Sequence, residues 1–340
     1  MVKVGILIGD VPAAMDPREH LDALFRQVDA AQRAGIKLIS IGQHFLYGDL
    51  RWLQPVPTLA RLAAELDDDV RLATTIMMVP LYNPVILAEE IATLDVMTGG
   101  RLDFGVGLGY RSHEFELLGV PYEDRVSRME EAIELMKLIW ACEPFSFEGK
   151  HWQIEHAEPH IRPIQQPHPP LWIGAHSRAG ARRAGRVGDA YTVPPEPEVE
   201  EINIRFDLVK EGFAARGKPF THQPVRRNVM MAPDHDTAIQ RFIDVSRDRY
   251  IAYAERELDI LDKDALERDF LATVGAHAIL GSYDEVITQL TDFLAAVPAD
   301  PVIIKPQWPT MSPDDVVAYL DEWGREIAPA VSEIEPAPLT

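Results

Sequence analysis

The stretch RLDFGVGLG, residues 101–109, combines an apolar strand pattern with glycines at alternate positions. Gly105, Gly107 and Gly109 share one face of this predicted strand, because successive residues point to opposite sides. Without Cβ atoms, that face leaves room for a flat ring or for tight packing against a neighbour. A dinucleotide fingerprint starting at Gly107 needs glycine at position 112, which is Ser112. A classical NAD-binding half-domain is therefore not supported.

Apolar strand patterns alternate with helical patterns on both sides of this stretch, as in parallel strands joined by crossover helices. Eight strand–helix units predict an α/β fold, a closed (β/α)8 TIM barrel, with insertions after strand 4 and around strand 7. The first insertion holds a predicted hairpin, FSFEGKHWQIE (145–155). The eight predicted strands are VKVGILI (2–8), IKLISIG (36–42), VRLATTIMMV (70–79), RLDFGVGLG (101–109), PPLWIGA (169–175), DAYTV (189–193), RRNVMMA (226–232) and DPVIIKP (300–306).

Composition narrows the class of protein. The 340 residues fit one barrel domain, which we place at 1–330, followed by a C-terminal tail at 331–340. A net charge of −21 would repel nucleic acid and anionic membranes. The single cysteine, Cys142, excludes an internal disulfide, and no apolar run reaches the roughly 20 residues of a membrane span. We expect a cytoplasmic protein that binds neither nucleic acid nor membrane.

Active sites of such barrels lie at the carboxyl ends of the strands, so residues just after each strand are the candidates. His44 follows strand 2, where it is either a site residue or a core histidine bonded to a carbonyl. Ser177 follows strand 5 as a predicted helix N-cap, so free backbone amides there can hold a phosphate. The alternative is that Ser177 only caps the helix, with Arg178, Arg182 and Arg183 forming a solvated face.

A metal site is not expected. Of the histidines between 151 and 176, only His156 and His160 have helical spacing, and Pro159 opposes a helix there. Arg226 and Arg227 stand at the start of the predicted strand 7, which places them at the opposite, stability face of the barrel. Trp308 follows strand 8 and is a further candidate for the site. Aromatic residues near the expected mouth indicate either a largely apolar pocket or rim packing; they are Phe45, Tyr47, Trp52, Tyr82 and Phe115.

The segments QHF (43–45), TTIMMVPLYNPVILAEEIATLDVMTGGRLDFGVGLGYRSHEFELLGV (74–120) and RPIQQPHPPLWIGAHSRAGARRAGRVGDAY (162–191) closely resemble the bacterial-luciferase-like flavin-dependent oxidoreductases. The resemblance covers nearly the whole chain and implies a (β/α)8 barrel, often dimeric, that binds FMN or an 8-hydroxy-5-deazaflavin coenzyme. It implies His44 as the catalytic residue near the ring's reactive edge. It implies these cofactor-binding residues: Thr74, Thr75 and Ile76 after strand 3, where a non-prolyl cis peptide is common; Gly107, Gly109 and Tyr110 after strand 4; and Gly174, Ala175, His176 and Ser177 at the phosphate.

The resulting functional hypothesis is a monooxygenase that uses reduced FMN, supplied by a separate flavin reductase, and O2 to oxidise a small organic substrate. Gln43-His44-Phe45 differs from the Glu-His-His of many FMN-using members and is closer to some deazaflavin enzymes. The alternatives are therefore a deazaflavin-dependent hydride-transfer oxidoreductase and a non-catalytic flavin-binding relative. A metal hydrolase barrel is disfavoured, because strand 1 ends in GILIGD without paired histidines. We expect a homodimer.

Overall fold

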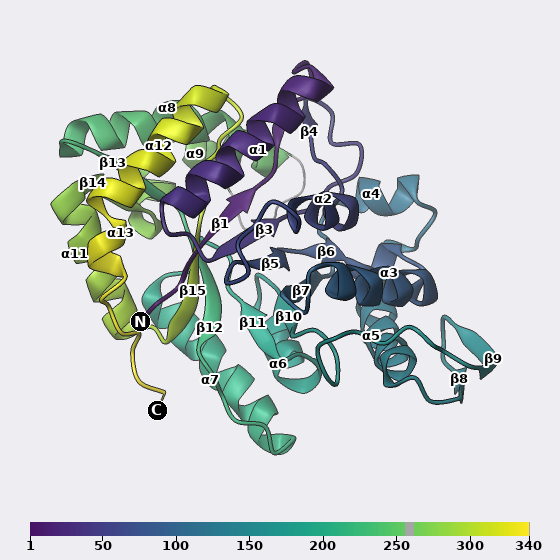
Figure 1. Cartoon of the computed structure of the whole chain (residues 1–340). Coiled ribbons are helices and arrows are strands. Elements are labelled where there is room, and N and C mark those ends of the chain that lie inside the picture. The colour runs from purple at the N-terminus through teal and green to yellow at the C-terminus, as the bar shows by residue number, and fades with distance from the viewer. Residues whose placement is uncertain (256–261, 340) are drawn as a thin grey trace.

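The computed structural model describes residues 1–255 and 262–339. Its centre is a barrel of eight parallel strands with helices around it (Figure 1). An isolated bridge between Val193 and Val225 joins the two ends of the sheet and nearly closes the barrel. The barrel strands, in chain order, are β1 (Val4–Ile8), β3 (Leu38–Ile41), β5 (Arg71–Thr74), β7 (Leu102–Gly107), β10 (Leu171–Gly174), β11 (Ala190–Thr192), β12 (Gln223–Arg227) and β15 (Ala299–Ile304). The predicted (β/α)8 fold is confirmed.

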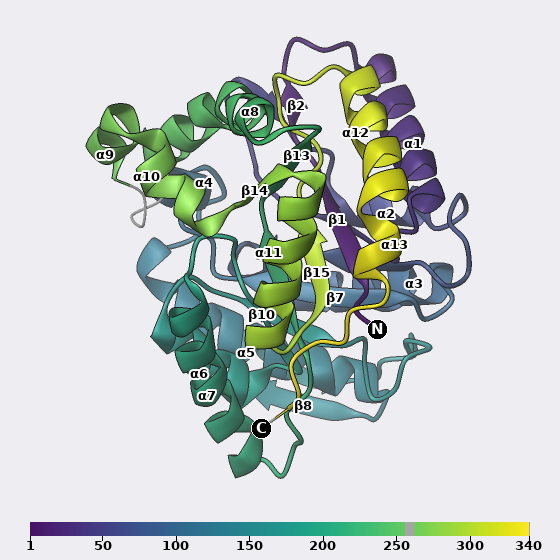
Figure 2. The ribbon, with the colours of Figure 1, turned by 90° about the vertical axis from the view of Figure 1, so that its left-hand side faces the viewer.

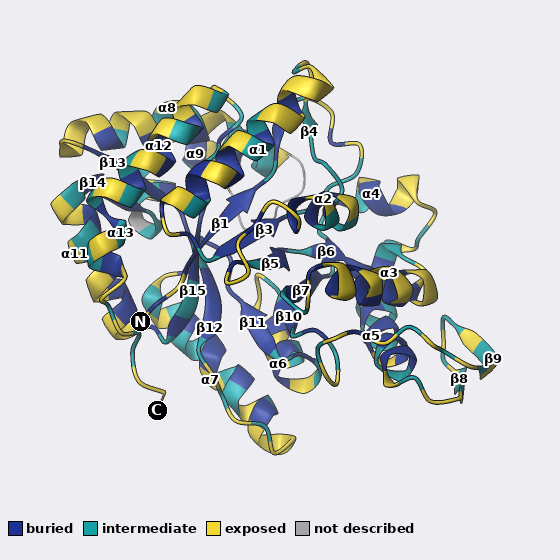
Figure 3. Cartoon of the chain, in the orientation of Figure 1, coloured by how far each residue is buried: buried dark blue, intermediate teal, exposed yellow. Residues whose placement is uncertain are grey.

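Helices cover the outside of the barrel, with their exposed faces outward and their apolar faces against the strands (Figure 3). Local sequence explains where several begin: Asp16 caps α1, and Ser312 with Asp315 forms a capping box at α12. The long helices are α1 (Pro17–Arg33), α2 (Pro55–Leu62), α3 (Pro84–Met97), α5 (Arg125–Ala141), α6 (Arg178–Val187), α7 (Val199–Ala215), α8 (His235–Glu255), α11 (Tyr283–Ala296) and α12 (Pro313–Glu326). Among the described residues, none of the helices is both long and apolar enough to cross a membrane.

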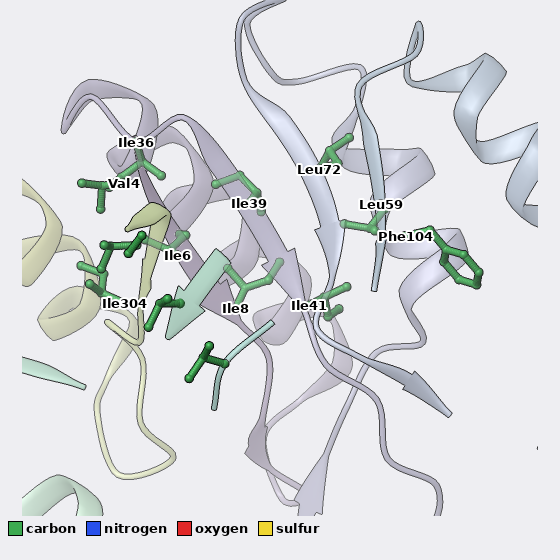
Figure 4. Packing of buried hydrophobic residues seen from close by; sticks show 14 of the residues in the cluster. Val4, Ile6, Ile8, Ile36, Ile39, Ile41, Leu59, Leu72, Phe104 and Ile304 are labelled. Atoms are coloured by element: carbon green, nitrogen blue, oxygen red, sulfur yellow. The ribbon is translucent and has the colours of Figure 1, made fainter. Parts of the chain in front are cut away.

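Two layers of apolar side chains hold the barrel. Ile6, Ile39 and Leu72 point outward and pack beneath the helices (Figure 4). The alternate residues fill the barrel interior as a separate cluster of Leu7, Leu38, Ala73, Trp172, Ala190 and Ile303. This alternation explains why the strands read as continuous apolar runs, because both of their faces are buried.

The insertions are where they were predicted. The hairpin of β8 (Phe145–Glu148) and β9 (Gln153–Ala157) stands out at the edge of the molecule (Figure 1). Around strand 7, β13 (Val229–Ala232) and β14 (Ile279–Ser282) pair with each other outside the barrel, and α8 packs on them (Figure 2). Shorter helices complete the chain: α4 (Ser112–Leu117), α9 (Lys263–Arg268), α10 (Phe270–Val274) and α13 (Ala328–Val331).

The predicted position of strand 7 in the sequence was wrong. The barrel strand is Gln223–Arg227, and the predicted segment 226–232 continues past it into β13. Arg226 therefore lies at the carboxyl end of the strand and lines the mouth of the barrel, not the stability face. Arg227 is buried and donates to the carbonyls of Pro195 and Pro197.

The predicted strand over residues 70–79 is interrupted. It runs as β5 to Thr74 and resumes as β6 (Met77–Met78), which pairs with β7. The peptide bond between Thr75 and Ile76 is cis. The interruption between β5 and β6, here called the Ile76 bulge, lies at the barrel mouth, and the Ile76 side chain lies against the glycine face of β7.

Candidate functional site

A cavity of about 450 Å³ opens at the carboxyl ends of the barrel strands. This is the end where TIM-barrel enzymes place their active sites. Each of the eight barrel strands has a residue at or next to its carboxyl end that lines the cavity: Ile8, Gly42, Thr75, Gly107, Gly174, Thr192, Arg226 and Lys305.

The cavity brings the predicted site residues together. His44, Thr75, Ile76, Gly107, Gly109, Tyr110, Gly174, Ala175, His176 and Ser177 all line it. Thr74 does not: its hydroxyl donates to the carbonyl oxygen of Gly105 at 2.7 Å and accepts from the Gly105 amide at 2.8 Å. Thr74 thus joins two barrel strands below the cavity floor.

The glycine face of β7 serves strand packing and the Ile76 bulge. A Cβ on Gly105 would lie 1.9 Å from the carbonyl oxygen of Thr74, which no side chain tolerates. A Cβ on Gly107 would lie 2.7 Å from the Ile76 side chain, and one on Gly174 would lie 2.6 Å from it. Gly105 therefore supports the tight-packing alternative, whereas Gly107 and Gly174 make room for the apolar side chain of Ile76 in the cavity lining.

His44 is held by a buried carboxylate. Its Nδ1 lies 3.1 Å from Oε1 of Glu114, whose side chain is fully buried. The same oxygen accepts the backbone amide of Phe45 at 2.7 Å, and Arg111 lies 3.5 Å away. Because a carboxylate only accepts, Nδ1 of His44 carries the proton and Nε2 is the nitrogen not engaged by Glu114. The site interpretation of His44 is favoured over a core histidine bonded to a carbonyl.

The turn after β10 has the form of an anion site. Ser177 caps α6 by accepting the Gly180 amide at 3.2 Å, so the first amides of the helix lie beside the cavity. Arg125, from the start of α5, also lines the cavity. Arg178 instead pairs with Glu201 on the exposed side, so the solvated-face interpretation holds for that arginine. The pKa of His176, in the same turn, is lowered because desolvation outweighs the opposing effect of nearby Glu196.

The aromatic residues predicted near the mouth are mostly packing residues. Of the five, only Trp52 lines the cavity. Phe115 is fully buried against Tyr122, and the hydroxyl of Tyr82 is hydrogen-bonded to Gln43. Trp308, the strand-8 candidate, does line the cavity.

Sequence reasoning missed a group of charged residues on the β1, β12 and β15 side. Asp10 follows β1 and pairs with Lys305, after β15, at 3.0 Å and with Arg249 of α8. Burial, followed by the positive charges of Arg249 and Arg226, lowers the pKa of Lys305 well below its ordinary value. Asp10 and Lys305 were detectable, because both come just after strand ends, whereas Arg249 comes from a helix that only the fold brings to the cavity.

The residues present fit a flavin. Ile76 offers an apolar surface, the Ser177 turn offers amides for a phosphate, and the volume suits a planar cofactor. Within the described part of the chain, several buried polar atoms of the cavity lining have no hydrogen-bond partner, among them Oγ1 of Thr75, Oγ1 of Thr192 and Nε1 of Trp308. Such atoms are normally paired, so they are available to the polar edge of a ligand. No group of three histidine, cysteine or acidic side chains suited to a metal occurs among the described residues.

Comparison with known proteins agrees with this geometry. The family model described as luciferase-like monooxygenase matches residues 2–300. The chain belongs to the luciferase-like monooxygenase family. It is 30% identical over 209 residues to the oxygenase component of the flavin-dependent trigonelline monooxygenase of Acinetobacter baylyi, covering 59% of this chain and 57% of that one.

Relatives within the family differ in cofactor. The F420-dependent glucose-6-phosphate dehydrogenase of Microbacterium testaceum is 32% identical over 167 residues, covering 47% of this chain and 48% of that one. The crystal structure of the monooxygenase RslO1 from Streptomyces bottropensis has the same fold, with a TM-score of 0.80, 24% identity, and coverage of 96% of this chain and 99% of that one. Luciferase-like monooxygenases and F420-dependent oxidoreductases are thus both relatives of this chain.

Proposed function

We propose that this protein is a flavin-dependent monooxygenase that takes reduced FMN from a separate reductase and uses O2 to oxidise a small organic substrate. The observation that carries the proposal is the convergence, in one strand-end cavity, of the Ile76 bulge, the Ser177 turn and His44. The flavin-dependent relative supports the same cofactor class. When bound, reduced flavin supplies the electrons and activates O2 for transfer of an oxygen atom to the substrate.

The chain's own residues position and protect this chemistry. The α6 amides beside Ser177, together with Arg125, would hold the phosphate, since helix N-termini and guanidinium groups both bind oxyanions. Ile76 would support one face of the ring, and the apolar side chains around it would exclude water. Glu114 fixes the proton of His44 on Nδ1, so Nε2 can orient the substrate or exchange a proton with it.

The second candidate is hydride transfer between substrate and a deazaflavin coenzyme, without O2. The F420-dependent relative and the single histidine of Gln43-His44-Phe45 favour it. A flavin-binding relative without catalysis is the third. Only the first of these functions needs O2 as a co-substrate, so oxygen dependence separates the candidates.

We also propose that the protein works as a homodimer in the cytoplasm. Helix α3 carries large apolar side chains on its outer side, among exposed acidic residues: Leu87 and Ile91 face the core, while Ile86 and Met97 are each 58% exposed. Exposed apolar side chains grouped on one helix are typical of a protein–protein contact. The twofold partner of a closed dimer would cover the same face on both copies.

The monooxygenase proposal is tested with ¹⁸O2. Purified protein, FMN, a flavin reductase and NADH are supplied with a panel of aldehydes, ketones and aromatic acids, and the products are analysed by mass spectrometry. We expect one class of substrate to gain an oxygen atom derived from O2, and His44→Asn to lose this activity. Substrate conversion that proceeds anaerobically with reduced F420, and no labelled product with FMN, would instead establish the hydride-transfer candidate.

A further inference from the structure

Arg226 has no partner for its charge. It lies at the end of β12 and lines the cavity. Among the residues that the structure describes, no carboxylate oxygen lies within 4 Å of its guanidinium, and its side chain makes no hydrogen bond. The chain carries 54 acidic residues against 33 basic ones, so an arginine facing the interior of a cavity without a carboxylate is unexpected.

The neighbouring wall is also positive. Lys305 and Arg249 share one carboxylate, Asp10, and all three side chains are at least nine-tenths buried. Lys305 donates one hydrogen bond, to Asp10, although its ammonium group can donate three. Glu196, the other acidic residue of the cavity lining, lies 3.8 Å from His176 and does not contact these cations.

The charges on this wall do not balance. Asp10 compensates one positive charge, which leaves Arg226 and one further cation uncompensated when Lys305 is protonated. A buried charge without a partner costs free energy that a bound anion would recover. The partly buried guanidinium of Arg226 presents several donors in one plane, which matches the two oxygens of a carboxylate.

Aromatic side chains lie beside these cations and could contact the apolar part of an organic acid whose carboxylate the cations bind. The ring of Trp308 lies 5.2 Å from the Lys305 ammonium group, and Trp52 and Tyr253 lie beside Arg249. These rings offer apolar, flat surfaces next to the positive wall. The Ser177 turn, expected to hold the flavin phosphate, follows β10, whereas the cations come from the neighbouring strands β12 and β15 and from α8.

From this arrangement we propose that Arg226, supported by Lys305, binds the carboxylate of an organic-acid substrate and holds its apolar body toward the flavin. This inference rests on the proposed function for the identity of the cofactor. The positive wall thereby selects carboxylate-bearing substrates over neutral ones of the same shape. Arg249 and Asp10 position Lys305 and do not touch the substrate.

The test compares benzoate with benzamide, a neutral molecule of nearly the same shape. Binding is followed by calorimetry and by tryptophan fluorescence in the cofactor-free chain, and by the flavin spectrum in the FMN-loaded chain. We expect benzoate to bind more tightly than benzamide. We expect Arg226→Gln to weaken the binding of benzoate by about 10- to 100-fold and to leave the binding of benzamide unchanged. Arg226→Lys should recover part of the loss, and Arg18→Gln, at an exposed arginine, should change nothing.

Several results would overturn the proposal. These are equal affinity for benzoate and benzamide, no binding of benzoate up to 10 mM (roughly the weakest affinity that a charged pocket of this size would give), or an unchanged benzoate affinity in Arg226→Gln. The proposal would also fail if Arg226→Gln weakened the binding of FMN but not that of riboflavin, because Arg226 would then hold the flavin phosphate. Since the cofactor-free chain also reports benzoate binding, failure to bind FMN would count against the proposed function alone.

Discussion

Replacing Glu114 with glutamine tests how the candidate catalytic histidine is held. The glutamine side chain keeps the shape of glutamate but loses its negative charge. In the native protein, Oε1 of Glu114 accepts from Nδ1 of His44 at 3.1 Å and from the backbone amide of Phe45 at 2.7 Å. Arg111, 3.5 Å away, loses its counter-charge in the same change. Hydrogen bonds to charged groups contribute about 1.5–3 kcal/mol each, so we expect the free energy of unfolding to fall by about 2–4 kcal/mol.

The functional effect follows from the lost charge. Oε1 of Glu114 accepts from both Phe45 and His44, so the glutamine oxygen takes that position and Nδ1 keeps its proton, but the neutral amide accepts less strongly than the carboxylate. We expect ¹⁵N spectra of histidine-labelled protein to show the Nδ1 proton retained. The rate of labelled-product formation should fall roughly 10- to 100-fold, with FMN affinity nearly unchanged, because a charge-assisted hydrogen bond to the catalytic histidine becomes a neutral one. The matched control is Glu116→Gln, on the same helix but exposed. Normal turnover in Glu114→Gln, or a proton that moves to Nε2, would refute the reasoning.

Three further predictions concern the scaffold. Gly105→Ala should unfold the protein or lower its melting temperature by more than 10 °C (roughly the shift for several kcal/mol), since the new Cβ meets the Thr74 carbonyl; calorimetry checks this, and an unchanged melting temperature would contradict the packing argument. Burial lowers the pKa of His20 to about 4, whereas unfolded histidine titrates near 6.5. The unfolded chain therefore takes up a proton that the folded chain refuses, so stability should fall by about 3 kcal/mol between pH 6.5 and 4; denaturant titrations should show less of this loss in His20→Gln. Ile86→Lys with Met97→Lys should convert the proposed dimer to monomer in light scattering, and a dimer that persists would place the interface elsewhere.

The barrel was predictable because its strands are buried on both faces, which makes each one a continuous apolar run such as VKVGILI. Strand 7 was misplaced because Gln223–Arg227 contains two arginines and a proline, and the more apolar VMMA that follows forms a strand outside the barrel. The Thr75–Ile76 cis peptide was indicated only by the family resemblance, since residue types alone do not show a non-prolyl cis peptide.

The site was predictable where one residue directly follows a strand, as His44 and Ser177 do. Pairings between residues far apart in the chain could not be predicted from the sequence. Glu114 is 70 residues from His44 in the chain, and only the meeting of two barrel loops shows that they touch. Asp10 and Lys305 are 295 residues apart, and neither looks unusual until burial makes their pairing costly.

The most direct test of the central claim is an anaerobic titration of the purified protein with reduced FMN and, separately, with reduced F420, after which air is admitted. The account predicts that reduced FMN binds more tightly and is then reoxidised by O2 at a rate that differs from that of free flavin. Tight binding of reduced F420, weak binding of FMN and no response to air would contradict it, and would make this protein a hydride-transfer enzyme.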